Sequence, residues 1–153
     1  MISDCRQTGN RKYSFDFLEE IEDIFVAAKD YLRNLKARGI QKDHILQSST
    51  LMLLDKNNMT RQYIDDYLQE NQIIIKDSID ISDMDLLIDF ARIGVGVACV
   101  IKNFVREDLE NGTLVEIPLG FPIHKREVGF AYKTTTKPSK SLAEFIHFYK
   151  TYR

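Results

Sequence analysis

The sequence predicts an α/β fold, with a mostly parallel sheet flanked by helices. Three short aliphatic segments, at residues 51–54, 73–75 and 95–101, have the composition of strands that are buried on both faces. Amphipathic helices are predicted between them, over residues 59–70 and from Ser82 or Asp83 to Gly94. Strands and helices that alternate in this order indicate βαβ units, in which the strands pair in parallel.

The remaining elements follow from local patterns along the chain. The first 17 residues show no apolar period, and a strand is predicted over residues 19–27. A short helix over residues 30–36 is expected to end at Gly39. Asn58 is a suitable N-cap for the helix over residues 59–70, because its side chain can accept a hydrogen bond from a backbone N–H of the first turn.

The C-terminal part of the chain predicts a short helix, two strands and a last helix. The helix covers residues 103–110, and the strands cover residues 114–117 and 128–132. Pro138 and Ser139 open the last helix, since proline is favoured in the first turn. Its apolar face carries Leu142, Phe145, Ile146 and Tyr149.

Composition excludes several classes of protein. The 153 residues suit one domain, and 21 basic against 23 acidic residues leave no positive excess for DNA phosphates. No apolar run approaches the roughly 20 residues of a membrane helix, and the N-terminus lacks a secretory signal. Cys5 and Cys99 are the only cysteines, which excludes a disulfide framework, and Cys99 is expected to be buried. We therefore predict a cytoplasmic domain that contacts neither DNA nor a membrane by itself.

No pattern of catalysis or cofactor binding is present in the sequence. The phosphate-binding P-loop pattern is missing, and the Gly-x-Gly at residues 94–96 is followed by Cys99 where a dinucleotide fingerprint needs glycine. The three histidines lie far apart, with no metal-ligand spacing. We predict no enzymatic activity, no cofactor and no metal site.

Two predicted strand ends are followed by capped helix starts, within residues 54–60 and 79–83. In open parallel sheets, ligands bind beyond the carboxyl ends of the strands, and free N–H groups at helix starts favour carboxylates or phosphates. Asn57, Asn58 and Thr60 add neutral hydrogen-bond donors. The same residues are equally consistent with helix capping alone, so the pattern leaves both interpretations open.

Six segments carry more information by their order and spacing than each does alone. They are the strand, loop and helix at residues 51–68, the helix start at 82–87, the strand at 94–101, the hairpin at 109–115, the strand at 126–132 and the helix at 138–148. In this order they resemble the LysR-type transcriptional regulators over about residues 20–150. Two positions depart from the family pattern, because Ile101 and Gln72 stand where proline and glycine are common.

The resemblance implies one lobe, the second, of a type 2 periplasmic-binding-protein-like effector domain. Residues 1–19 would be an N-terminal segment or the tail of a missing first lobe, residues 20–134 the second lobe, and residues 135–153 the helix that returns to the first lobe. It implies an effector-sensing fragment that binds a small, anionic metabolite and modulates transcription in a homo-oligomer, which we expect to be a dimer. DNA would be contacted only through a winged helix-turn-helix that is absent from this chain.

The resemblance also implies a set of effector contacts on the cleft side of this lobe. The residues carried over are Asn57, Asn58, Met59, Thr60, Ser82, Asp83, Val100 and Ile101. The charge of Asp83 would oppose an anion. The alternative is a self-standing small-molecule-binding protein or enzyme with a flavodoxin-like α/β core. That protein would bury its last helix inside a compact monomer, whereas a fragment would leave the apolar face of the helix exposed or covered by a second chain.

Overall fold

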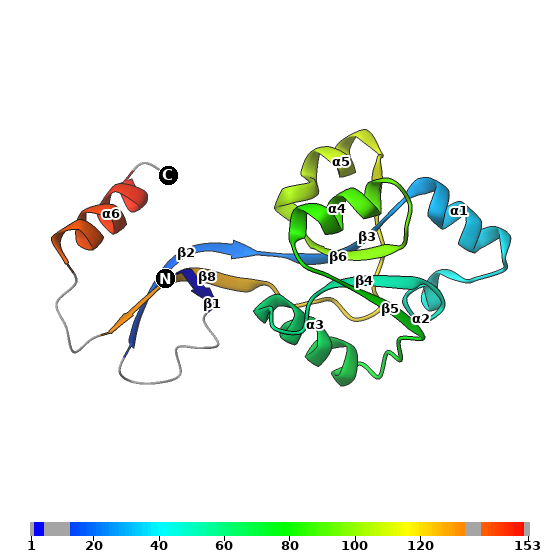
Figure 1. The fold of residues 1–153 in the computed structure, drawn as a ribbon, viewed down its shortest axis with the longest axis horizontal. Helices are drawn as coiled ribbons and strands as arrows, with labels where there is room; N and C mark the ends of the chain where they lie inside the picture. Colours follow the sequence, from blue (N-terminus) through cyan, green and yellow to red (C-terminus); the bar gives the residue numbers. More distant parts are fainter. Residues whose placement is uncertain (1, 5–12, 134–138, 152–153) are drawn as a thin grey trace. The chain divides into compact units, whose positions relative to one another are not determined.

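The computed structural model describes residues 2–4, 13–133 and 139–151, and these residues form two compact units (Figure 1). The central unit comprises residues 22–124, and the terminal unit comprises the described parts of residues 1–21 and 125–153. The predicted lobe, residues 20–134, extends beyond the central unit by two residues at its N-terminal end and by ten at its C-terminal end. The reason is that residues 126–133 pair with strands from the N-terminal part of the chain.

The central unit is built on a five-stranded sheet in the order β5-β4-β6-β3-β7. β4 pairs in parallel with β5 and β6, whereas β3 pairs antiparallel with β6 and β7. The α/β prediction is confirmed, but the sheet is mixed. All six residues of β3 are buried, and a strand covered on both faces has the same composition whichever way its neighbours run. The strands are β3 (Asp23–Ala28), β4 (Thr50–Leu54), β5 (Asp77–Ile81), β6 (Val97–Ile101) and β7 (Leu114–Glu116).

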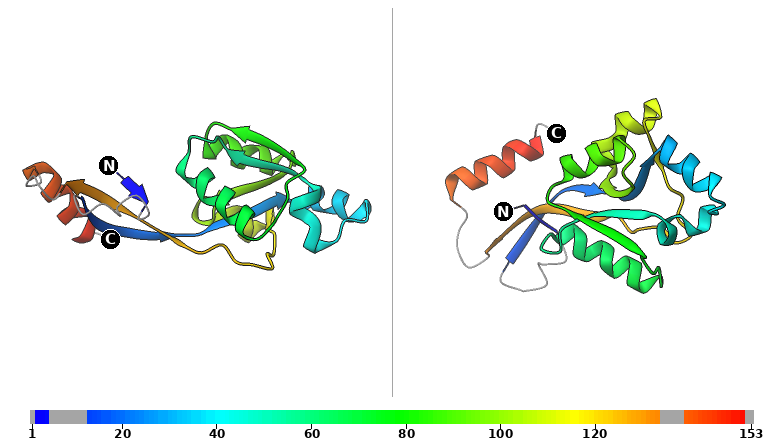
Figure 2. Two further views of the ribbon diagram at one scale, coloured as in Figure 1. Left: turned by 90° about the horizontal axis from the view of Figure 1, so that it is seen from below. Right: turned by 45° about the vertical axis from the view of Figure 1, so that its right-hand side comes forward.

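Helices cover both faces of this sheet (Figures 1 and 2). α3 packs on one face with Phe25 and Leu53, and α4 packs on the other with Ile24 and Met52. Successive residues of a strand point to opposite faces, so β3 and β4 each contribute side chains to both cores. The helices are α1 (Lys29–Ala37), α2 (Ile45–Ser48), α3 (Met59–Glu70), α4 (Met84–Arg92) and α5 (Arg106–Asn111), with 3-10 turns at Lys42–His44 and Lys102–Val105.

Most of the predicted elements are confirmed, and one strand is wrong. α3 has the predicted bounds, and Cys99 is buried in the core, whereas Cys5 lies outside the described residues. The aliphatic run at residues 73–75 is not a strand, and the strand lies further on, at β5. Ile73 instead closes the end of α3 by donating its N–H to the carbonyl of Leu68 at 2.9 Å, and Ile74 is 80% exposed. β5 is an edge strand with mostly exposed residues, so its composition is polar.

The terminal unit contains a three-stranded antiparallel sheet and one helix. The strands lie in the order β1-β8-β2, with β1 at Ile2–Asp4, β2 at Tyr13–Ile21 and β8 at Arg126–Lys133. The aromatic residues at positions 13, 15 and 17 alternate with other residues, which is the period of a strand that the sequence prediction missed. The helix α6 spans Lys140–Thr151, and Pro138 lies outside the described residues. Ile146 is buried, whereas Phe145 and Phe148 are at least half exposed.

Within the described residues, no helix is both long and apolar enough to cross a membrane.

Gly96 directly precedes β6 and lies close to the backbone of β4. A Cβ atom at this position would lie 2.4 Å from the backbone oxygen of Thr50. Gly96→Ala is therefore expected to lower the free energy of unfolding by about 1–3 kcal/mol, because the two strands must move apart. Gly120→Ala is the control, since a Cβ there meets nothing within 4 Å. Urea denaturation measures both changes, and equal losses for the two variants would contradict the prediction.

Gln72 is the one described residue other than glycine with a positive φ, 55°. It follows the end of α3, at the position where the family pattern favours glycine. Side chains are strained in this left-handed conformation, so Gln72→Gly is expected to raise the free energy of unfolding by about 0.5–1 kcal/mol. Asn71→Gly is the control, because Asn71 has a φ of −94° and gains nothing from glycine. The prediction fails if urea midpoints show Gln72→Gly to be less stable than the parent protein.

Candidate functional site

The carboxyl ends of β4, β5 and β6 lie at one edge of the central sheet, which we call the strand-end edge. Leu54 pairs with Ile81, the last residues of β4 and β5, and β6 runs parallel to β4 on its other side. The edge is formed by the residues that follow these strands: 55–60 after β4, 82–84 after β5, and Ile101 at the end of β6. The structure therefore brings together segments that are up to 46 positions apart in the sequence.

Polar side chains organise the start of α3 at this edge. Asn58 is the N-cap, and its Oδ1 accepts a hydrogen bond from the N–H of Thr60 at 2.9 Å. Asp55 turns the chain before the helix, because its Oδ1 accepts from the N–H of Asn57 at 3.1 Å. Asn57 and Asn58 are exposed, and Met59 and Thr60 are half-buried. Among the described residues, the N–H of Met59 has no hydrogen-bond partner, so it is available to a ligand.

The start of α4 repeats this arrangement after the neighbouring strand. Asp83 is the N-cap, and its Oδ1 accepts from the N–H of Leu86 at 2.8 Å. Ser82 and Asp83 are exposed, and Met84 is half-buried. The Asp83 carboxylate is thus engaged by its own helix, as the capping interpretation predicts. The hydroxyl of Ser82 remains a neutral donor beside it.

The two predicted site residues from β6 lie differently. Val100 is 0% exposed and packs in the core on the α4 side of the sheet, so its side chain does not reach the strand-end edge. Ile101 is half-buried at the end of the strand, opposite Asp23 of β3.

Arg61 is a residue of this edge that sequence reasoning missed. It is 7% exposed, and its guanidinium donates to the carbonyl of Leu54 at 2.8 Å, to Asp80 at 2.6 Å and to Asp65 at 2.9 Å. Burial lowers the pKa of Arg61, but the hydrogen bonds and charges of the two carboxylates outweigh burial and raise it. Arg61 therefore ties the first turn of α3 to the last residue of β4 and to β5. The spacing of four positions between Arg61 and Asp65 on the predicted helix was the sequence pattern that could have indicated their ion pair.

Lys102 follows the edge directly but is already paired. Its Nζ lies 3.4 Å from Glu22 and 3.5 Å from Glu116, and its backbone N–H donates to the carbonyl of Glu22. Burial lowers the pKa of Lys102, while the two carboxylates raise it, and the net direction is upward. The amine is therefore charged, with its charge balanced locally.

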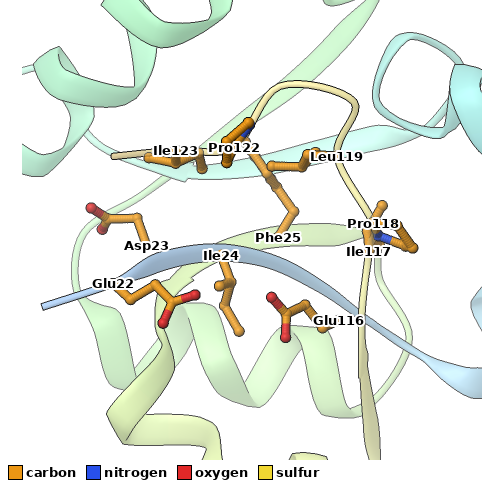
Figure 3. Close-up of a pocket in the computed structure, with 10 residues that line it drawn as sticks. All are labelled: Glu22, Asp23, Ile24, Phe25, Glu116, Ile117, Pro118, Leu119, Pro122 and Ile123. Atoms are coloured by element: carbon orange, nitrogen blue, oxygen red, sulfur yellow. The ribbon is translucent and has the colours of Figure 1, made fainter. Parts of the chain in front are cut away.

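A pocket of about 420 Å³ opens beside the start of β3 (Figure 3). Figure 3 shows Glu22 and Glu116 on one side of the strand and Asp23 on the other. Asp23 is only 2% exposed, and the other two carboxylates pair with Lys102. This acidic lining disfavours an anionic ligand, so the strand-end edge suits the predicted chemistry better than the pocket does. The described residues contain no group of three His, Cys, Asp or Glu side chains suited to a metal.

Residues 13–153 match a protein family described as the LysR substrate binding domain. The chain belongs to this family. The match covers both units, and it assigns the chain to the regulatory, ligand-binding part of LysR-type transcriptional regulators. Among curated protein sequences, none matches the chain.

Solved regulatory domains share the fold of this LysR domain. That of HypT from Salmonella typhimurium, in the apo form, is 18% identical, with a TM-score of 0.76 over 98% of this chain and 70% of that chain. That of CcmR from Synechocystis PCC6803, in complex with 2-PG, is 11% identical, with a TM-score of 0.78 over 99% and 71%. The OxyR2 E204G mutant from Vibrio vulnificus, sulfate-bound, is 14% identical, with a TM-score of 0.68 over 98% and 70%. These neighbours confirm the periplasmic-binding-protein-like fold class, and the mixed sheet differs from the all-parallel sheet of a flavodoxin-like core.

Removal of the Arg61 guanidinium is expected to destabilise the central unit. Arg61→Met keeps the apolar stem but leaves the Leu54 carbonyl without this donor, so the free energy of unfolding should fall by about 2 kcal/mol. Arg61→Lys should lose part of this amount, since one ammonium cannot reach all three acceptors in the fork geometry of arginine. Arg33→Met is the control, because Arg33 forms an exposed ion pair with Asp30 and should change stability by less than about 0.5 kcal/mol. Equal urea midpoints for Arg61→Met and the parent protein would show that the network adds nothing.

Proposed function

We propose that the strand-end edge is the part of an effector site that this chain contributes to a LysR-type regulator, and that the effector is a small anion. In the whole regulator, effector binding would change the balance between two arrangements of a homodimer and thereby its binding to DNA through a winged helix-turn-helix. Catalysis has no part in this function. The cytoplasmic location stays a prediction.

One observation carries the proposal: two capped helix starts follow neighbouring parallel strands at the same edge of the sheet. The N–H groups and dipoles of α3 and α4 then act on a common region, which favours a negative charge there. Exposed Asn57 and Ser82 supply further donors without charge, and Lys56 adds an exposed cation in the same turn. The carboxylate of Asp83 keeps its charge while it caps α4, so it is the least favourable of the predicted contacts for an anion.

The proposed contacts follow the predicted set with one change. Asn57, Asn58, Met59, Thr60, Ser82 and Asp83 all lie on the strand-end edge, as does Ile101. Val100 is left out as a side-chain contact because it is fully buried. The anionic class is supported by two structural neighbours, the bromide-bound HypT regulatory domain and the sulfate-bound OxyR2 mutant.

The test is a titration of the ¹⁵N-labelled chain with sodium sulfate at constant ionic strength. Saturable shifts are expected at the amides of Met59, Thr60 and Met84. Ser82→Asp places a negative charge at the edge and should weaken sulfate binding about five-fold, which is the effect of one charge at short range in a hydrated site.

Ser78→Asp is the matched control for this titration. Ser78 is an exposed serine of β5, the strand that Ser82 follows, and it pairs with Leu51 near the opposite end of the sheet. It should change the sulfate affinity by less than about two-fold, because the added charge is distant and screened. Shifts spread over the whole surface, or equal weakening by the two variants, would reject the anion site.

A further inference from the structure

The segment that leads from the central unit into β8 is held mainly by one helix. Residues 117–124 lie between β7 and the start of the terminal unit at Lys125. The prolines at positions 118 and 122 lack a backbone N–H. Among the described residues, three hydrogen bonds fix the segment: the N–H of Ile117 to the carbonyl of Phe25, and the hydroxyls of Tyr67 and Tyr63 to the carbonyls of Phe121 and His124.

Both tyrosines belong to α3 and are buried. Their rings pack in the core cluster that also contains Ile117 and Ile123. The Tyr63 hydroxyl lies 2.6 Å from the carbonyl oxygen of His124. Burial, with a smaller effect of the nearby Cys99, raises the pKa of Tyr67, so its hydroxyl keeps the proton that it donates. The last four residues before the terminal unit are therefore bound to α3 at two points.

The first turn of the same helix, which precedes both tyrosines, is fixed to the strand-end edge. Asn58 caps the helix there, and Arg61 binds the last residue of β4. Twelve helical residues span about 18 Å, so one rigid element contacts both the proposed effector site and the segment that enters β8. A change in the position of its first turn would move the two hydroxyls with it.

We propose that Tyr63 and Tyr67 are positioning residues that couple the strand-end edge to the chain segment entering β8. The proposal rests on the proposed function, since it assigns the route by which occupancy of that site reaches the terminal unit. An anion bound at the start of α3 favours one position of the helix. The two hydroxyls, which move with the helix, then shift the carbonyls of Phe121 and His124 to which they donate. By linkage, the position of the segment also changes the affinity of the edge for its ligand.

The test compares two cap removals by amide hydrogen exchange on the full chain. Asn58→Ala loosens the start of α3, and Asp83→Ala is the matched control, because it removes an equivalent cap from α4 at the same edge. Asn58→Ala is expected to speed exchange at residues 119–121, 123 and 124 about five-fold more than Asp83→Ala does. Equal effects of the two variants would overturn the proposal.

A second arm repeats the comparison in the Tyr63→Phe/Tyr67→Phe background. These substitutions keep the rings and remove only the hydroxyls, so the extra effect of Asn58→Ala should fall to that of Asp83→Ala. A purely structural role of the hydroxyls would add a constant increase in exchange and leave the difference between the caps unchanged. If the double variant does not fold, Tyr67→Phe alone should reduce the difference by about half, and an undiminished difference would overturn the proposal.

Sodium sulfate separates this proposal from the proposed function. One outcome is that sulfate shifts the amide resonances of Met59 and Met84 and also those of residues 119–124, by equal amounts in the parent and the double variant. That result would overturn the proposed coupling and leave the proposed anion site supported. If sulfate does not bind at the edge, the proposed function fails, while the comparison of Asn58→Ala with Asp83→Ala still decides whether α3 controls the segment.

Discussion

Arg61 is charged and lies almost wholly inside the protein, so the fold itself must supply its acceptors. A buried guanidinium is strongly unfavourable unless carboxylates and carbonyls surround it. Here the acceptors come from three elements: the end of β4, the edge strand β5 and α3 itself. The interaction can form only when these elements meet in one arrangement. The relative positions of the two strand ends and of the first turn of α3 therefore depend on this one side chain.

The contacts of Arg61 with β4, β5 and α3 also determine the geometry of the strand-end edge. The cap of α3 lies one turn before Arg61, and the cap of α4 follows the strand that carries Asp80. The N–H groups at the two helix starts are held in place before any ligand arrives, which lowers the entropy lost on binding. The same helix, through two buried hydroxyls, holds the chain where it leaves the central unit. The helix α3 thus contributes both to the strand-end edge and to the contacts that hold the segment entering β8.

The sequence predicted the parts of this design that depend on local pattern. The bounds of α3 and its cap Asn58 follow from periodicity and side-chain chemistry within one turn, and the same chemistry narrows the cap of α4 to Ser82 or Asp83. The direction of β3 and its place beside β6 could not be predicted, because residues 23 and 101 meet only in the folded sheet. The aliphatic run at 73–75 has the composition of a buried strand. In the structure these residues are aliphatic for another reason, because they close α3 and pack partly on the core. The predicted site includes Val100 because a resemblance between sequences indicates which residues end a strand. It does not indicate to which face of the sheet each side chain points.

β5 forms one edge of the central sheet, and within the described part of the chain it pairs with β4 alone. An exposed edge strand offers backbone N–H and C=O groups to any other extended chain, and such edges promote aggregation. β5 carries two carboxylates, Asp77 and Asp80, and the Asp80 carboxylate is 43% exposed even while it binds Arg61. A second copy of β5 laid alongside in parallel register would place each carboxylate beside its counterpart, which is unfavourable. The carboxylate that stabilises the buried guanidinium therefore also protects the sheet from self-association through its open edge.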